Sequence, residues 1–204
     1  MNFIRKIYDW VLSWADKPSG ATALCFISFA EASFFPIPPD VLLIPLAIGN
    51  RLKAIYFGLI CSISSVFGAM FGYAIGLWIW WSGPTEFSGL ANFFFEHVPG
   101  FNKIAFFNVK ELYDQYDFLI IFTAGFTPIP FKLFTISGGA FGIKFPQFII
   151  AAFVGRTLRF MLVTLLLKIY GESIERFINK YFNILTIIFL LLLIGGFFII
   201  KVIL

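Results

Sequence analysis

The chain has 204 residues, of which 60% are hydrophobic and 13% charged, about half the charged share of a typical soluble domain. This composition excludes an ordinary soluble domain and predicts an all-α integral membrane protein with one membrane domain over 1–204. The net charge of +4 is spread over loops. Nucleic-acid binding is not expected, because that needs a concentrated basic patch, whereas dispersed charge suits contact with anionic lipid surfaces.

The first segment, 2–17, has polar residues at helical spacing with Trp10 and Trp14 among the apolar remainder. This pattern predicts an amphipathic helix lying in the membrane interface. A soluble amphipathic helix packed on a partner is the alternative. The segment mixes charges with aromatics and lacks a short apolar core with a cleavage site, so a signal peptide is not expected.

Segment 20–49 is apolar but interrupted. A continuous spanning helix needs about 20 residues without breaks, and this stretch is too short for two full crossings and a turn. We therefore predict a first re-entrant hairpin, tolerated where protein or a water-filled cavity covers its irregular backbone. The interrupting residues are Glu31, Pro36, Pro38, Pro39, Asp40 and Pro45.

Segment 54–81 is predicted to be a spanning helix. Small residues recur every fourth position and form a stripe that allows close helix packing: Ser64, Gly68, Gly72 and Gly76. Three tryptophans mark its interfacial end: Trp78, Trp80 and Trp81.

The most polar stretch, 82–117, is predicted to be an extracytoplasmic loop with short helices. Asn108 followed by Glu111 resembles a helix start with a capping box. His97 is expected to be a solvated loop residue. Cys25 and Cys61 lie in apolar stretches and are expected to be small side chains buried in the membrane. No spacing for a metal site occurs, so neither a metal nor a cofactor is expected.

The remaining segments repeat the earlier pattern. A second re-entrant hairpin is predicted over 118–143, and spanning helices are predicted over 145–170 and 182–203. The breaks expected in the second hairpin are Pro128, Pro130, Gly138 and Gly139, and Lys132 follows the prolines. Arg156 and Arg159 lie on the helix 145–170.

The two hairpins form a repeat, because Pro36-Ile37-Pro38 aligns with Pro128-Ile129-Pro130 at an offset of 92 residues. One crossing and a loop separate the copies, so the second enters from the opposite face, as in inverted-repeat transporters. The positive-inside rule places the N-terminus in the cytoplasm. Eight basic residues are then cytoplasmic against four outside: Arg5, Lys6, Lys17, Arg51, Lys53, Lys168, Arg176 and Lys180 against Lys103, Lys110, Lys144 and Lys201.

Five ionisable residues fall at predicted membrane depth: Glu31, Asp40, Lys132, Arg156 and Arg159. Unpaired, they would cost on the order of 12–17 kcal/mol together. We hypothesise that the two acids face the three bases near the midplane, leaving a surplus of +1. Such a site can accept phosphate, since the arginine fork suits it, and a carboxylate there can carry a proton. The alternative is a static ion-pair cluster that pins the two hairpins.

Several motifs resemble the DedA membrane proteins, also called the VTT-domain or SNARE-associated Golgi protein family, and in particular a YqaA-like bacterial branch. They are Glu31 followed by P-I-P-P-D, then G-F-T-P-I-P-F-K, a small-residue turn ending at Gly142, and G-R-T-L-R-F at 155–160. The similarity covers about residues 20–170.

The resemblance implies two opposed re-entrant hairpins and a multi-pass protein of the bacterial inner membrane. It implies a role in moving undecaprenyl phosphate or other lipids with dependence on the proton-motive force, and eukaryotic relatives are lipid scramblases. Glu31 and Asp40 would match the family's acidic pair, and Lys132 takes the place of a hairpin arginine. Where many members have another arginine, this chain has Gly125, and Arg156 and Arg159 would supply the missing charge.

The expected function is therefore a flippase or scramblase for an anionic, phosphate-bearing lipid, with protons as the coupling partner and a homo-oligomer compatible with the sequence. The alternatives are a proton-coupled exporter of small cations or drugs, which would want acids dominant in the site, and a structural envelope protein. An enzyme is not expected, because Ser137 has no histidine partner at membrane depth. Transport driven by ATP hydrolysis of the protein itself is not expected either, because no nucleotide-binding loop occurs.

Overall fold

A computed structural model describes residues 19–35, 37–83, 86–97, 102–171 and 173. The predicted interfacial helix 2–17, the predicted spanning helix 182–203 and Pro36 lie outside these residues. The described part of the chain is all-helical, apart from one isolated bridge between Trp81 and Phe87. Its elements in order are α2 (Gly20–Ser33), α3 (Asp40–Gly49), η1 (Arg51–Lys53), α4 (Ala54–Trp80), α5 (Gly89–His97), α6 (Lys103–Phe126), α7 (Phe131–Phe141) and the helix Phe145–Gly171.

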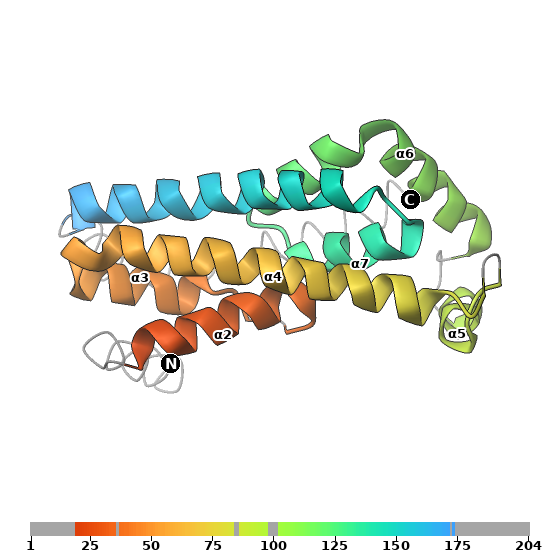
Figure 1. Ribbon diagram of the computed structural model, residues 1–204, viewed down its shortest axis with the longest axis horizontal. Coiled ribbons are helices and arrows are strands. Elements are labelled where there is room, and N and C mark those ends of the chain that lie inside the picture. The colour runs from red at the N-terminus through yellow and green to blue at the C-terminus, as the bar shows by residue number, and fades with distance from the viewer. Residues whose placement is uncertain (1–18, 36, 84–85, 98–101, 172, 174–204) are drawn as a thin grey trace.

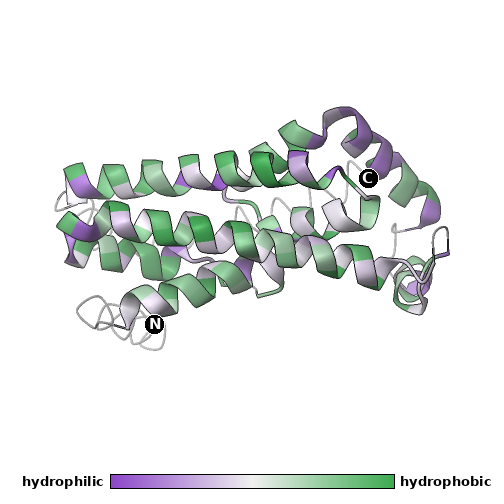
Figure 2. Cartoon of the chain, viewed as in Figure 1, coloured by the Kyte–Doolittle hydropathy of each residue, from purple (hydrophilic) through white to green (hydrophobic). Residues whose placement is uncertain are grey.

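Two long helices are apolar enough to cross a membrane, Arg51–Trp80 and Phe145–Gly171. They lie side by side and antiparallel, because Gly58 faces Thr164 whereas Gly171 faces Arg51 (Figure 1). Hydrophobic residues cover most of both helices, and hydrophilic residues gather on the first half of α6 (Figure 2). This distribution supports the coarse prediction of a helical protein with membrane-spanning segments.

Pro38, Pro39, Pro128 and Pro130 interrupt the helices where the sequence predicts, whereas the predicted interruption at Pro45 is wrong, because Pro45 lies inside α3. α2 ends at Ser33, and α3 begins at Asp40 with Pro39 as its N-cap residue. α6 ends at Phe126 and α7 begins at Phe131, so Pro128 and Pro130 lie in the connecting loop. Proline lacks the N–H of a continuing helix and restricts the residue before it. The segments 34–39 and 127–130, called here the two proline loops, lie near the middle of the long axis (Figure 1).

The prediction that Gly138 and Gly139 break the second hairpin is wrong. Both are helical and buried within α7. The helix ends instead at Gly142, whose φ of 69° is the left-handed conformation that glycine adopts without steric cost. Gly139 is needed for a different reason, because a Cβ atom there would collide with the carbonyl oxygen of Tyr73 on α4.

The helix start expected at Asn108 is also wrong. α6 begins at Lys103, and Asn102 caps it, with its side-chain oxygen accepting from the N–H of Ala105 at 2.9 Å. The backbone of α6 leaves helical geometry at Tyr116, where a kink divides the element. The kink lies close to the predicted border between the polar loop and the second hairpin.

Both hairpins pack on α4 through its glycine stripe. Gly68 faces the carbonyl of Phe29 on α2, and Gly76 faces the carbonyl of Ile136 on α7. Gly72 lies between them, against Thr135 and the carbonyl of Ala32. The absence of a side chain lets three backbones approach closely, as predicted for this stripe.

Two buried apolar clusters surround the middle of the molecule. The larger one joins α4, α6, α7 and the Phe145–Gly171 helix and includes Tyr73, Ile121 and Phe148. A second cluster joins α2, α3 and α4 to Phe160. The pattern of helix, proline loop, helix and long helix thus occurs twice, as α2–α4 and as α6 to Phe145–Gly171. The inverted, re-entrant placement of the hairpins in a membrane stays a prediction.

Replacing Gly76 by alanine tests this packing. The added Cβ atom would overlap the Ile136 carbonyl, so we expect a loss of about 3 kcal/mol in unfolding free energy. Thermal unfolding of the purified protein in detergent measures it. Gly89→Ala is the matched control, because a Cβ there meets nothing within 4 Å. Equal stability of both variants would contradict the close approach.

Candidate functional site

Arg156 is the largest fully buried side chain of the described residues. Its Nη2 donates to Glu31 Oε2 in a salt bridge, and its Nε donates to Ser65 Oγ at 2.6 Å. Phe131 and Phe160 cover the guanidinium, with ring centroids 4.8 and 4.7 Å from Cζ. A buried charge is tolerated when it is paired, hydrogen-bonded and in contact with aromatic faces, and Arg156 has all three.

Arg159 makes the second ion pair, with Asp40. Its Nη2 donates to Asp40 Oδ2 at 2.5 Å, and its Nη1 donates to the carbonyl of Thr127 at 3.1 Å. Asp40 is the first residue of α3, whereas Thr127 follows the last residue of α6. One guanidinium therefore joins the ends of the two proline loops.

The two pairs differ in burial. The side chains of Arg156 and Glu31 are 1% and 10% exposed, whereas those of Arg159 and Asp40 are 15% and 20% exposed. Breaking a fully buried pair leaves an uncompensated charge. The partly exposed pair can exchange its partners at lower cost, because water or another ion can reach it.

Local structure explains the placement of these side chains. Arg156 and Arg159 are three residues apart and share one helix face. Asp40 lies in the first turn of α3, where the helix dipole favours a carboxylate. Glu31 lies in the last turn of α2, where the dipole disfavours it, so Arg156 is its main stabilising partner.

Lys132 takes no part in either pair. It is half-buried on the first turn of α7, and within the described residues no carboxylate forms a salt bridge with it. The hypothesis that both acids face all three bases therefore resolves into two one-to-one pairs. The surplus positive charge of this set of five belongs to Lys132 rather than to the arginines.

The sequence analysis did not identify Ser65 or Thr127 as partners of the arginines. Ser65 lies among several serines of an apolar helix, and only its place beside the glycine stripe singles it out. Thr127 contributes its backbone carbonyl, which no sequence pattern reveals. Phe131 and Phe160 adjoin charged motif residues, but phenylalanine is too common in this chain, with 30 residues, to signal an arginine contact.

Side-chain hydrogen bonds fix the hairpins around the site. Thr135 Oγ1 of α7 donates to the carbonyl of Ala32 on α2 at 2.8 Å and links the two hairpins directly. Tyr113 and Ser137 hydroxyls are 2.9 Å apart and join α6 to α7. Burial raises the pKa of Tyr113 to about 12, so its hydroxyl stays protonated at physiological pH.

The described residues contain no group of three histidine, cysteine, aspartate or glutamate side chains that could hold a metal ion. His97, at the end of α5, stacks on Phe93 with ring centroids 4.3 Å apart. Cys61 is buried within the protein, and Cys25 is exposed on the surface of the helix bundle. The expected burial of both side chains in the membrane stays a prediction. Ser64 Oγ donates to Cys25 Sγ at 3.0 Å.

The chain is similar over nearly its full length to a protein of Haemophilus influenzae. The two are 34% identical over 203 residues, which is 98% of this chain and 100% of that protein. A protein of Histophilus somni is 29% identical over 174 residues, or 85% of each chain. Both are described as uncharacterized proteins. No family model matches the chain, and no solved structure matches it.

The difference in burial predicts unequal costs of neutralising the two acids. Glu31→Gln leaves the Arg156 charge buried without its counter-ion, so we expect a loss of about 3–5 kcal/mol in stability. Asp40→Asn removes one charge-assisted hydrogen bond from a partly exposed pair, for an expected loss of about 1.5–3 kcal/mol. Denaturation in detergent compares the two.

The double variant Glu31→Gln, Arg156→Met provides the control for the buried pair. Removing both charges avoids an unpaired ion, so it should be more stable than Glu31→Gln alone. A double variant less stable than either single variant would show that the pair is not coupled as the contacts indicate.

Proposed function

This chain belongs to the same family as the Haemophilus influenzae protein, and from the site it carries we propose a transporter of the DedA type that flips or scrambles a phosphate-bearing lipid across the bacterial inner membrane. Undecaprenyl phosphate and phospholipids are the candidate substrates, and protons are the proposed coupling ion. The proposed transporter crosses the membrane several times and has its N-terminus in the cytoplasm.

One observation carries the proposal: the partly exposed Asp40–Arg159 pair holds the two proline loops together. Broken helices in corresponding halves of a chain are where transporters bind their substrates. A guanidinium that already binds a carboxylate with one edge has the geometry to bind a phosphate instead.

Proton coupling follows from competition for Arg159. With Asp40 ionised, the carboxylate occupies the guanidinium, and a phosphate must displace it. Protonation of Asp40 removes the competing negative charge and frees Arg159 for the phosphate. Release of the proton then restores the ion pair and expels the anion, so proton binding and phosphate binding support each other.

Lys132 supplies the remaining positive charge. It makes no salt bridge with a described carboxylate, whereas both arginines do. A phosphate monoester carries more than one negative charge near neutral pH, so a second cation suits it, and Lys132 follows the loop whose Thr127 carbonyl binds Arg159. The same arrangement disfavours an exporter of small cations, because both acids of the site are already engaged by arginines.

A static role is favoured for one part of the site only. The Glu31–Arg156 pair is nearly inaccessible, and Arg156 also donates a hydrogen bond to Ser65, which suits a structural role. We assign it the task of holding α2, α4 and the Phe145–Gly171 helix together while the other pair opens. The transport proposal therefore depends on Asp40, Arg159 and Lys132 and not on Glu31 and Arg156.

Flipping of a fluorescent polyprenyl phosphate in proteoliposomes tests the proposal. The wild-type protein should accelerate flipping and respond to a pH gradient. Arg159→Gln should slow flipping by about 10- to 100-fold, because it removes charge-assisted hydrogen bonds to the phosphate. Asp40→Asn should lose the response to the gradient, since its side chain cannot bind or release the proton.

Exposed residues of the same charge provide controls. Lys132→Gln should slow lipid flipping. Lys144→Gln, at the residue that directly precedes the Phe145–Gly171 helix, should flip lipid at the wild-type rate. Asp114→Asn on α6 should keep the pH response, since Asp114 pairs with Lys110 at the surface. Normal flipping and normal pH response of Arg159→Gln and Asp40→Asn, with correct insertion, would leave the static envelope protein as the better explanation.

A further inference from the structure

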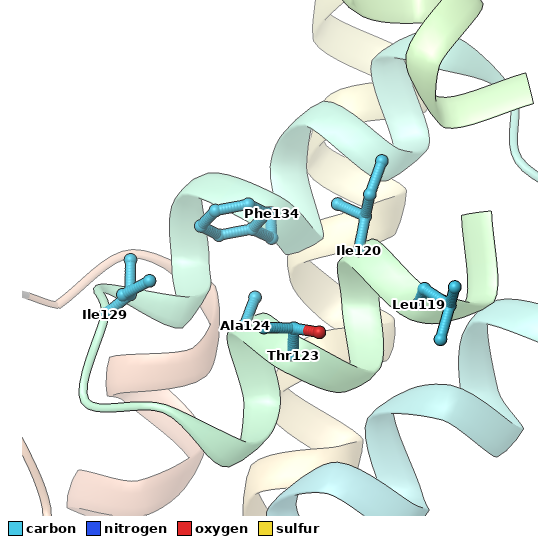
Figure 3. A pocket seen from close by; sticks show the side chains of 6 residues that line it. All are labelled: Leu119, Ile120, Thr123, Ala124, Ile129 and Phe134. Carbon is cyan, nitrogen blue, oxygen red and sulfur yellow. The ribbon is translucent and has the colours of Figure 1, made fainter. Parts of the chain in front are cut away.

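An apolar groove lies between α6 and α7, beside the second proline loop. It has a volume of about 320 Å³ and is shallow, open to the outside over most of its extent. Residues from one face of α6 form one wall, and residues of the loop and α7 form the other (Figure 3). The lining residues are Leu119, Ile120, Thr123, Ala124, Ile129 and Phe134.

The groove lies beside the loop that contacts one cation of the site. Ile129, which lines the groove, belongs to the second proline loop, and Thr127 of the same loop binds Arg159 through its carbonyl. Lys132 lies on the first turn of α7, between the lining residues Ile129 and Phe134 in the sequence. An amphiphile with an anionic head and an apolar chain fits an apolar groove next to a loop that contacts an arginine.

We propose that this groove binds one hydrocarbon chain of a lipid whose anionic headgroup lies against Lys132 and Arg159. The inference rests on the proposed function and adds a second contact for the same substrate. The bound hydrocarbon chain lies along α6 and α7, and the other hydrocarbon chains of the lipid lie outside the protein.

The dimensions and chemistry of the groove favour a hydrocarbon chain over other occupants. Its volume is at the lower end of ligand sites, which span about 300–1,000 Å³. A packed helix, about 10 Å across with its side chains, needs a wider trough. Thr123 is the one lining residue with a polar side chain, so a polar solute would find few hydrogen-bond partners. Leu119 and Ile129 are 57% and 43% exposed, so the lining is accessible to lipid.

Photolabelling of the full chain in detergent micelles tests the inference. The probe is phosphatidylglycerol with a diazirine in the middle of one acyl chain, and mass spectrometry locates the labelled residues. We expect labels within 119–134 that saturate with probe concentration. Unlabelled phosphatidylglycerol should compete, and phosphatidylcholine should compete poorly because its head has no net charge.

A variant that fills the groove gives the sharper test. Thr123 is exposed on the groove wall, so Thr123→Trp should block the groove without disturbing the core. It should raise the probe concentration for half-maximal labelling by about tenfold, the loss of about two buried methylene contacts. Leu112→Trp is the matched control, since Leu112 is 54% exposed on α6 outside the groove, and its labelling should equal the wild type.

Three results would overturn the inference. If phosphatidylcholine competes as well as phosphatidylglycerol, the groove does not recognise an anionic headgroup and is only part of the general lipid-facing surface. Unchanged labelling of Thr123→Trp would exclude the groove as the site. A disulfide formed between Thr123→Cys and a cysteine introduced within 182–203 would place that segment of the chain in the groove instead.

The experiment separates this inference from the transport proposal. Saturable labelling of the groove by a protein that flips no lipid would refute transport and leave the binding site in place. Flipping without saturable labelling would refute the groove and leave transport in place.

Discussion

The burial of the Arg156 guanidinium is the constraint on which the rest of the fold depends. A charge with almost no exposure must find all of its partners within the protein. Its partners are Glu31 on α2, Ser65 on α4, Phe131 on α7 and Phe160 on its own helix. Separating α2 removes the counter-ion of Arg156, and separating α4 or α7 removes its hydroxyl partner or one of its aromatic contacts, so each of these losses makes the buried charge more costly.

That convergence requires backbones to approach more closely than ordinary side chains permit. The glycines of α4 place α2 and α7 against its backbone, and Gly139 of α7 does the same from the other side. The Thr135 hydroxyl then reaches the carbonyl of Ala32 across the two hairpins. Small residues and the buried charge thus act together, because the glycines bring the elements near enough for one guanidinium to bind them all.

Much of this arrangement is predictable from local chemistry. Prolines in apolar segments indicate where the helices stop, and Arg156 and Arg159 are expected on one face because a helix places residues three apart together. The pairing is not predictable, since two acids and three bases allow several combinations that only the tertiary contacts distinguish. Gly138 and Gly139 are also not predictable from local sequence, because glycine can end a helix or allow a close helix contact. Gly139 allows a close contact, since the carbonyl of Tyr73 on α4 lies against it. Asn102 and Asn108 are both plausible caps, and only the structure shows that Asn102 is used, with its side chain accepting from the N–H of Ala105.

A single helical turn separates the inaccessible arginine from the accessible one. Arg159 lies about 4.5 Å along the helix axis from Arg156, yet its partners are the ends of the two proline loops rather than the helix bundle. Phe160 contacts both guanidinium groups, with centroid distances of 4.7 Å to Arg156 and 5.7 Å to Arg159. Asp40 binds Arg159 and Glu31 binds Arg156, so each acid has its own arginine. One turn of helix therefore separates an ion pair buried in the helix bundle from one at the ends of the proline loops, which is the separation that the proposed function requires.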